Sequence, residues 1–332
     1  MAIKYVRFNY FEPILVPADT FFRDQIEGED GIRNFYAEEV PAERWDMSII
    51  LDYFMVNTEH NTSVEIGDEF AEIEPGSYHY HERDDYYYFQ ISKLRDNNIP
   101  AKKRVNEIKE DILLNQDEFI GEFVSLLFDN AYGAIAMQSN LYGVSSKQAE
   151  IVLTNLRQIY MYENDITEEI PLVVQLSPII DRGQINKVFN SDYYKKVRIK
   201  GSDVMLDANI GENNLLSEAT SLVNRTAGIN FDITVSLGRS EKTASLNEDV
   251  IRELIEVYQG LEDEVKPKVE LTALENEEAQ IETVNLLEPR MTDRFTINIA
   301  PRTTVGHEYL INTFIEKSFN RRRPEMRRVM RP

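Results

Sequence analysis

Two groups of cations stand out in a chain that is otherwise acidic. The first follows the aromatic run at residues 86–89 and consists of Lys93, Arg95, Lys102, Lys103 and Arg104. Lysine and arginine side chains bind phosphate oxygens, and neighbouring aromatic rings stack on bases. The pattern therefore predicts contact with a nucleic-acid backbone. A solvated loop that follows a core strand is the alternative.

The second group lies at residues 317–332, where seven cations accompany a single acid, Glu325. We predict phosphate contacts from the following arginines of this stretch: Arg321, Arg322 and Arg323, supported by Arg327 and Arg328. The planar guanidinium group matches the geometry of phosphate oxygens. Pairing with the chain's own carboxylates, or disorder, is the alternative.

The charge of the whole chain limits where a polyanion can bind. The 332 residues include 36 Lys and Arg and 58 Asp and Glu, for a net charge of −22. Residues 317–332 carry +6, which leaves −28 on the remainder. An acidic protein repels nucleic acid and anionic membranes, but charges more than about 10 Å apart are largely screened at cellular salt. The asymmetry predicts a confined site for DNA or RNA on a surface that otherwise repels it.

The residue types that usually carry catalysis form no recognisable pattern. The sequence has no cysteine, which excludes disulfides, thiolate metal sites and cysteine nucleophiles. It has neither a Gly-x-Ser-x-Gly elbow nor a glycine-rich phosphate-binding loop. We therefore predict a protein that is not an enzyme, with no catalytic residue and no cofactor.

Two short patterns keep metal binding open as an alternative. His79 and His81 stand two residues apart in a strand-like stretch, so they face the same side and could share a metal with a carboxylate. Exposed strand histidines are the interpretation that we favour. The tripeptide Glu107-Ile108-Lys109 resembles the end of a metal-dependent nuclease site, which needs a strand to aim both charged side chains together. Its surroundings are those of a helix or turn, so we predict no metal site there.

No feature of the sequence predicts a membrane protein. Residues 3–16 alternate between apolar and polar types, which predicts a strand in place of a signal peptide. No run of eighteen uncharged apolar residues occurs, and a membrane-spanning helix needs about that many. The lack of cysteine suits a reducing compartment, so we expect a cytoplasmic protein without membrane insertion.

A chain of this length exceeds the usual size of one hydrophobic core, so two domains are expected. We predict a β-rich domain over residues 1–162, mostly antiparallel and closed by a helix, and an α/β domain over residues 163–332 with a basic tail. Within the first, the hydrophobic pattern predicts strands at 3–16 and 47–56, further strands within 65–94 and 122–140, a short helix or turn at 107–114 and a helix at 145–161. Ser145 is the predicted N-cap of that helix.

The second half predicts alternating strands and helices around a mixed sheet. The expected strands are 171–179, 196–201, 228–238, 267–274, 280–287 and 294–300, and the expected helices are 214–225, 247–258 and 305–320. The last helix should end before Pro324, because proline removes a backbone hydrogen bond and clashes with the preceding turn. The predicted fold class is α/β in the broad sense, or α+β.

Several segments carry a resemblance to a known family. They are ISKLRDNNIP (91–100), DEFIGE (117–122), LLFDN (126–130), AMQSNLYGVS (136–145), GINFDITVSLG (228–238) and KVELTALENEE (268–278). In their order and hydrophobic pattern they resemble bacterial phage-defence proteins such as RexA of the Rex exclusion system and KwaB of the Kiwa system. The resemblance implies a homodimer of two α/β domains that binds double-stranded DNA without sequence preference. It also implies a defence system that can include a second protein.

Charge and resemblance together predict a non-enzymatic component of a bacterial or phage-borne anti-phage defence system that binds or senses DNA. The acidity of this chain departs from a protein that binds DNA constitutively, and favours a gated contact that depends on a partner. Two alternatives remain. One is an acidic module that binds a basic protein or mimics DNA, and the other is a metal-dependent nuclease.

Overall fold

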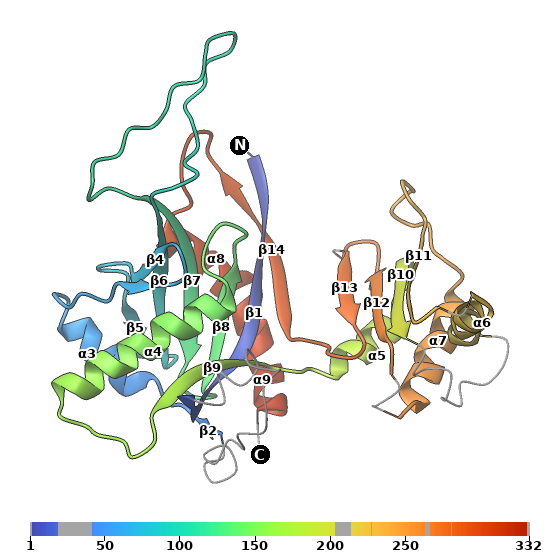
Figure 1. The fold of residues 1–332 in the computed structure, drawn as a ribbon. Coiled ribbons are helices and arrows are strands. Elements are labelled where there is room, and N and C mark those ends of the chain that lie inside the picture. Colours follow the sequence, from blue (N-terminus) through green and yellow to red (C-terminus); the bar gives the residue numbers. More distant parts are fainter. Residues whose placement is uncertain are drawn as a thin grey trace. The chain divides into compact units, whose positions relative to one another are not determined.

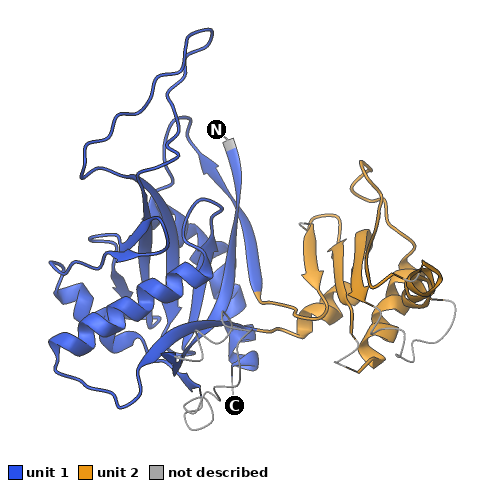
Figure 2. Ribbon diagram, in the orientation of Figure 1, with its two compact units in different colours: residues 1–179, 292–332 blue, residues 180–291 orange. Residues whose placement is uncertain are grey.

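The structure is a computed structural model that describes residues 2–18, 42–202, 214–226, 228–262, 266–279 and 281–330. Of the cations in the tail, Arg331 lies outside the described residues. The chain forms two compact units, residues 1–179 with 292–332 and residues 180–291 (Figure 2). Both contain helices and strands, so the predicted α+β class is confirmed. Among the described residues, no helix is long and apolar enough to cross a membrane.

The units divide the chain differently from the expected boundary between residues 162 and 163. Unit 1 includes β9 (Leu172–Pro178), which pairs with the C-terminal half of β1 (Ala2–Pro17). The chain then leaves for unit 2 and returns at β14 (Thr292–Ile299), which pairs antiparallel with the N-terminal half of β1. An alternating pattern predicts that a segment is a strand, but does not reveal which strand it will pair with.

An antiparallel sheet of ten strands forms the centre of unit 1 (Figure 1). Its main path runs β14-β1-β8-β7-β6-β4-β3, with β2 and β9 paired to β1 and β5 paired to β6. The remaining strands are β2 (Glu43–Arg44), β3 (Val64–Glu65), β4 (Phe70–Ile73), β5 (His79–His81), β6 (Tyr86–Arg95), β7 (Ile120–Asp129) and β8 (Ala134–Ser139). Strands β6 and β7 pair along their whole lengths, from Tyr86 opposite Asp129 to Arg95 opposite Ile120.

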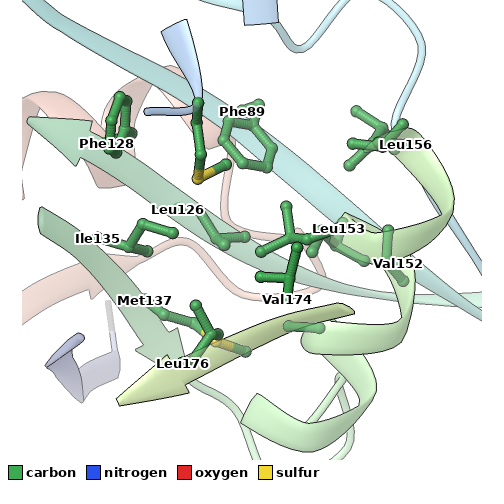
Figure 3. Close-up of a cluster of buried hydrophobic side chains, with 14 of the residues drawn as sticks. Phe89, Leu126, Phe128, Ile135, Met137, Val152, Leu153, Leu156, Val174 and Leu176 are labelled. Atoms are coloured by element: carbon green, nitrogen blue, oxygen red, sulfur yellow. The ribbon is translucent and has the colours of Figure 1, made fainter. Parts of the chain in front are cut away.

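Helices α3 (Ser48–Val56) and α4 (Ser146–Glu163) cover one face of this sheet, and the main core of unit 1 lies between them and the strands (Figure 3). Its side chains include Phe89, Leu126, Ile135, Val152 and Leu156. The predicted N-cap of α4 is confirmed, because the Ser145 side chain accepts a hydrogen bond from the backbone N–H of Gln148 while the Gln148 side chain accepts one from Ser145.

The predicted strand at 47–56 is wrong, since this segment is helix α3. Its buried residues Ile50, Leu51 and Phe54 fall on one side of a helix, and the backbone N–H of Ser48 is bound by the Asp46 carboxylate. A short, continuous apolar run has no period that separates a buried strand from a buried helix. The pattern was therefore ambiguous at this point.

The opposite face of the sheet is covered by one long helix in three parts: α8 (His307–Phe314), the π-helical turn η3 (Ile315–Phe319) and α9 (Asn320–Val329). Phe314 stacks on Phe8 of β1 with the ring centres 3.9 Å apart. The expected end before Pro324 is wrong, because the helix continues through the proline. Arg322 and Arg323, just before Pro324, bond to Asp293 and Asp129 of the sheet, and these contacts hold the helix where the proline lacks a backbone N–H.

Unit 2 contains a sheet in the order β11-β10-β12-β13 that is antiparallel throughout, so the predicted mixed sheet is wrong. Its elements are α5 (Gly183–Phe189), β10 (Tyr193–Ser202), α6 (Leu215–Thr226), β11 (Asn230–Ser236), α7 (Glu248–Gly260), β12 (Lys268–Leu274) and β13 (Glu282–Asn285). The core packs α7 against β10 and β12. Charged side chains of the sheet pair with one another, as Arg198 does with Asp232 at 2.6 Å.

Candidate nucleic-acid interface

The two predicted groups of cations lie at opposite ends of strand β7. Residues 96–119, which we call the arm, connect β6 to β7 and lead into β7 at Ile120. Helix α9 is fixed to the other end of β7, where Arg323 binds Asp129. A strand of ten residues is about 30 Å long. The structure therefore does not bring the two groups together into one basic face.

The arm projects from the end of the sheet in unit 1 (Figure 1). Lys102 and Glu110 close it into a hairpin, with N–H···O bonds of 2.8 and 2.9 Å between their backbones. Beyond them the chain reverses in a turn closed by a 3.2 Å bond from the Glu107 N–H to the Arg104 carbonyl. Asn106 has φ +63°, in the left-handed region that this turn requires. We call residues 102–110 the tip.

The tip holds all the positive charge of the arm. Its cations are Lys102, Lys103, Arg104 and Lys109, whereas four of the six acidic residues of the arm lie nearer the sheet. Every residue of the tip is exposed. The Lys103 ammonium donates to the Glu107 carbonyl, and the Arg104 guanidinium lies 3.3 Å from the Glu107 carboxylate with its side chain 75% exposed. Exposed pairs of this kind contribute little, so these cations are available to a phosphate.

The other members of the first group lie at the base of the arm. Arg95 is the last residue of β6, and its Nε is buried without a hydrogen-bond partner in the described part of the chain. Lys93 is paired with Glu69 at 2.5 Å, and both side chains are mostly buried. Lys93 and Arg95 thus lie against the sheet, and among the cations of the first group only Lys102, Lys103 and Arg104 are exposed.

Arg322 is held by carboxylates on the inner side of α9. Its Nη2 donates to Asp293 Oδ1 at 2.7 Å and to the Thr292 carbonyl at 3.1 Å, and it also pairs with Glu325. Tyr10 donates to the other oxygen of Asp293 at 2.6 Å. Burial opposes the charged guanidinium, but the hydrogen bond and charge of Asp293 outweigh it and raise the pKa of Arg322. This arginine joins α9 to β14 and β1.

Arg323 is held in the same way by β7. Its Nε and Nη2 donate to the two oxygens of Asp129 at 2.7 and 3.1 Å, and Nη2 also donates to the Asp84 carbonyl at 2.6 Å. Its guanidinium lies over the rings of Tyr132 and Phe319. Burial raises the pKa of the Asp129 carboxyl, although the neighbouring guanidinium acts to lower it. Two of the predicted phosphate ligands are therefore structural.

The remaining arginines of the second group lie on the outer side of α9. Arg321, Arg327 and Arg328 are exposed, and they flank the exposed Pro324. Within the described part of the chain, Arg321 and Arg327 have no ion-pair partner. These three cations form a second candidate surface, but it lies on the body of unit 1.

The histidines of β5 face one side, as the spacing predicts. His79 stacks on Tyr88 and His81 stacks on Tyr86, with ring centres 4.9 and 4.8 Å apart. Among the described residues, no three His, Asp or Glu side chains form a group that could hold a metal ion. Glu107-Ile108-Lys109 lies in the tip, beyond the strands.

His307, to which the sequence assigned no role, fixes the first turn of α8 to the sheet. Its Nδ1 is 2.9 Å from the Ser125 hydroxyl of β7, and its ring lies 5.5 Å from that of Tyr88. Burial, together with the nearby His79, lowers the pKa of His307 to about 4. The ring is therefore neutral near pH 7.

Sequence reasoning missed Lys109 as a member of the basic tip. Residues 107–114 were predicted as a short helix or turn, which separated Lys109 from Lys102, Lys103 and Arg104. The backbone bridge between Lys102 and Glu110 places them together, and no period in the sequence signals a single bridge. Val105 and Ile108 stand three residues apart, a spacing that also suits a helix, so the sequence carries no clear signal for the hairpin.

Comparison with known proteins places the whole of this architecture in one family. Residues 1–325 match the model of DUF6731, which is described as a family of unknown function. The chain belongs to this family. The DUF6731 match spans both units and includes the arm and most of α9. No curated protein matches the chain.

Proposed function

We propose that this DUF6731 protein binds double-stranded DNA through the tip of its arm, as a non-enzymatic component of a bacterial or phage-borne anti-phage defence system. The observation that carries the proposal is the concentration of exposed cations on a segment that projects from an acidic protein. The defence setting follows from the resemblance to the RexA and KwaB proteins.

The projection of the arm reconciles DNA binding with the charge of the chain. Six residue steps separate Asp96 from Lys102, a reach of up to about 20 Å in extended chain. The Debye length at physiological salt is about 8 Å, so the field of the acidic body is largely screened at the tip. A polyanion can therefore approach the tip while the body repels it.

The outer side of α9 supports the proposal less well. Recruiting Arg322 or Arg323 to a phosphate would break buried pairs with Asp293 and Asp129, which is costly. Arg321, Arg327 and Arg328 stay exposed, but they lie directly on the acidic body. Their value is as a control, because they offer the same charge in a different place.

Binding at the tip should be largely independent of DNA sequence. Lysine and arginine contacts to phosphate position a protein on the duplex without reading base edges. A homodimer would present two tips to one duplex, which would strengthen binding through the higher local concentration of the second tip.

A titration of labelled double-stranded DNA, single-stranded DNA and RNA, followed by fluorescence polarisation at three salt concentrations, tests the proposal. We expect binding of double-stranded DNA that weakens steeply with salt, because cations release counterions from the backbone. No binding at low salt would contradict it. Co-purification with a basic protein, without nucleic acid, would favour the acidic interaction module. Cleavage of plasmid DNA in magnesium or manganese would favour the nuclease.

A further inference from the structure

Two aliphatic side chains stand in water among the cations of the tip. Val105 and Ile108 are each 88% exposed, so the described chain covers neither. Both side chains lie within the tip, three residues apart and among its cations. A partner that removes them from water gains hydrophobic free energy.

The turn holds both side chains at the extreme end of the arm. Val105 occupies the first corner of the turn that runs from Arg104 to Glu107, and Asn106 occupies the second. Ile108 follows directly after the turn. Arg104 precedes Val105 and Lys109 follows Ile108, so a cation borders the aliphatic pair on each side.

This interleaving favours a nucleic acid over a protein as the partner. The centres of protein interfaces are depleted of lysine, because a buried ammonium is costly to desolvate. Proteins that enter the DNA minor groove use the opposite arrangement, in which cations bind the phosphates along the groove and an apolar side chain wedges between base pairs.

On the basis of the proposed function, we propose that the tip enters the minor groove of double-stranded DNA and that Val105 and Ile108 wedge against a base step and kink the duplex. Lys102, Lys103, Arg104 and Lys109 bind the phosphates that border the groove. The minor groove of straight DNA is only about 6 Å wide. Kinking toward the major groove opens it, so the wedge also makes the room that the hairpin needs.

A bending assay separates the wedge from the phosphate contacts. A duplex of about 30 base pairs carries a donor and an acceptor dye at its ends, so that a kink of about 20–90° raises energy transfer. The unaltered protein is compared with a Val105→Ser, Ile108→Ser variant, which keeps every charge, and with a Lys102→Ser, Lys103→Ser variant, which keeps both aliphatic residues.

We expect the protein to raise energy transfer, and the variant without the aliphatic pair to bind with an unchanged salt dependence, about tenfold more weakly, and without bending the duplex. The variant without the two lysines should bind more weakly with a smaller salt dependence, yet bend the DNA that it does bind. Binding without bending by the unaltered protein would overturn this inference alone, whereas no binding at all would also overturn the proposed function. If the variant without the aliphatic pair still bends the DNA, the inference is overturned. If that variant also sediments as a monomer where the unaltered protein sediments as a dimer, the two side chains belong to a protein interface.

Discussion

Arg323 of α9 and Asp129 of β7 form an ion pair through two hydrogen bonds, Nε to Oδ2 at 2.7 Å and Nη2 to Oδ1 at 3.1 Å. The carboxylate is fully buried, and 194 positions separate the two residues in the sequence. This pair fixes the last helix to the central sheet. The run of arginines at the C-terminal end therefore has two sides, one that builds the fold and one that faces water.

Replacing Asp129 with alanine should destabilise unit 1. The change leaves the Arg323 guanidinium partly buried without its partner carboxylate, which costs about 3 kcal/mol of unfolding free energy. Urea denaturation followed by tryptophan fluorescence measures the loss, since the only tryptophan, Trp45, is buried in unit 1. Arg327→Ala is the control, because an exposed substitution should stay within about 0.5 kcal/mol. Equal effects of the two changes would contradict the structural role of the pair.

The double substitution Arg322→Ala, Arg323→Ala should separate stability from DNA binding. The two adjacent arginines each bind a buried carboxylate, so their loss should lower the unfolding free energy by several kcal/mol. Affinity for DNA, measured at a low temperature where circular dichroism shows folded protein, should change by less than about threefold. A large loss of affinity in folded protein would mean that these arginines also contact the phosphates.

The salt dependence of binding should report four phosphate contacts for each tip. Four contacts give a slope of about −3.6 in log affinity against log salt, or a loss of roughly a hundredfold between about 50 and about 200 mM. Lys109→Ser should reduce that slope by about one. Titrations at several salt concentrations measure both values. A slope that Lys109→Ser leaves unchanged would remove this residue from the interface.

Stability should decline in mild acid because of His307. Its pKa is near 4 in the folded protein, below the value of about 6.5 in the unfolded chain. The unfolded chain thus binds more protons between these values, so stability falls as the pH drops from about 6.5 to about 4, by on the order of 2 kcal/mol. Urea denaturation across this range, compared with His307→Gln, measures the effect. A His307→Gln variant with the same decline would assign it to other groups.

Local patterns in the sequence sufficed for much of the fold. The alternation at residues 3–16 predicted β1, and Ser145 marked the start of α4. Both signals are local, because a strand period or an N-cap involves only neighbouring residues. The helix through Pro324 and the return of β14 to unit 1 depend instead on partners far away in the sequence, such as Asp293 and Asp129.

The candidate site was predictable in its residue types but not in its geometry. Lys102, Lys103 and Arg104 were identified from their charge and from the aromatic run that precedes them, and the structure places them on an exposed hairpin. Charge could not reveal that Arg322 and Arg323 have carboxylate partners. It also could not reveal that α9 and the arm lie at opposite ends of β7, because composition contains no distances.

A comparison of two charge-matched variants tests the central claim most directly. One carries Lys102→Ser, Lys103→Ser and Arg104→Ser in the tip, and the other carries Arg321→Ser, Arg327→Ser and Arg328→Ser on the outer side of α9. Each removes three positive charges from exposed positions, so the net charge is the same. We predict that the tip variant loses affinity for double-stranded DNA by on the order of a hundredfold at low salt, while the α9 variant stays within about threefold of the unaltered protein. Loss of binding in the α9 variant, with the tip variant unaffected, would contradict the account.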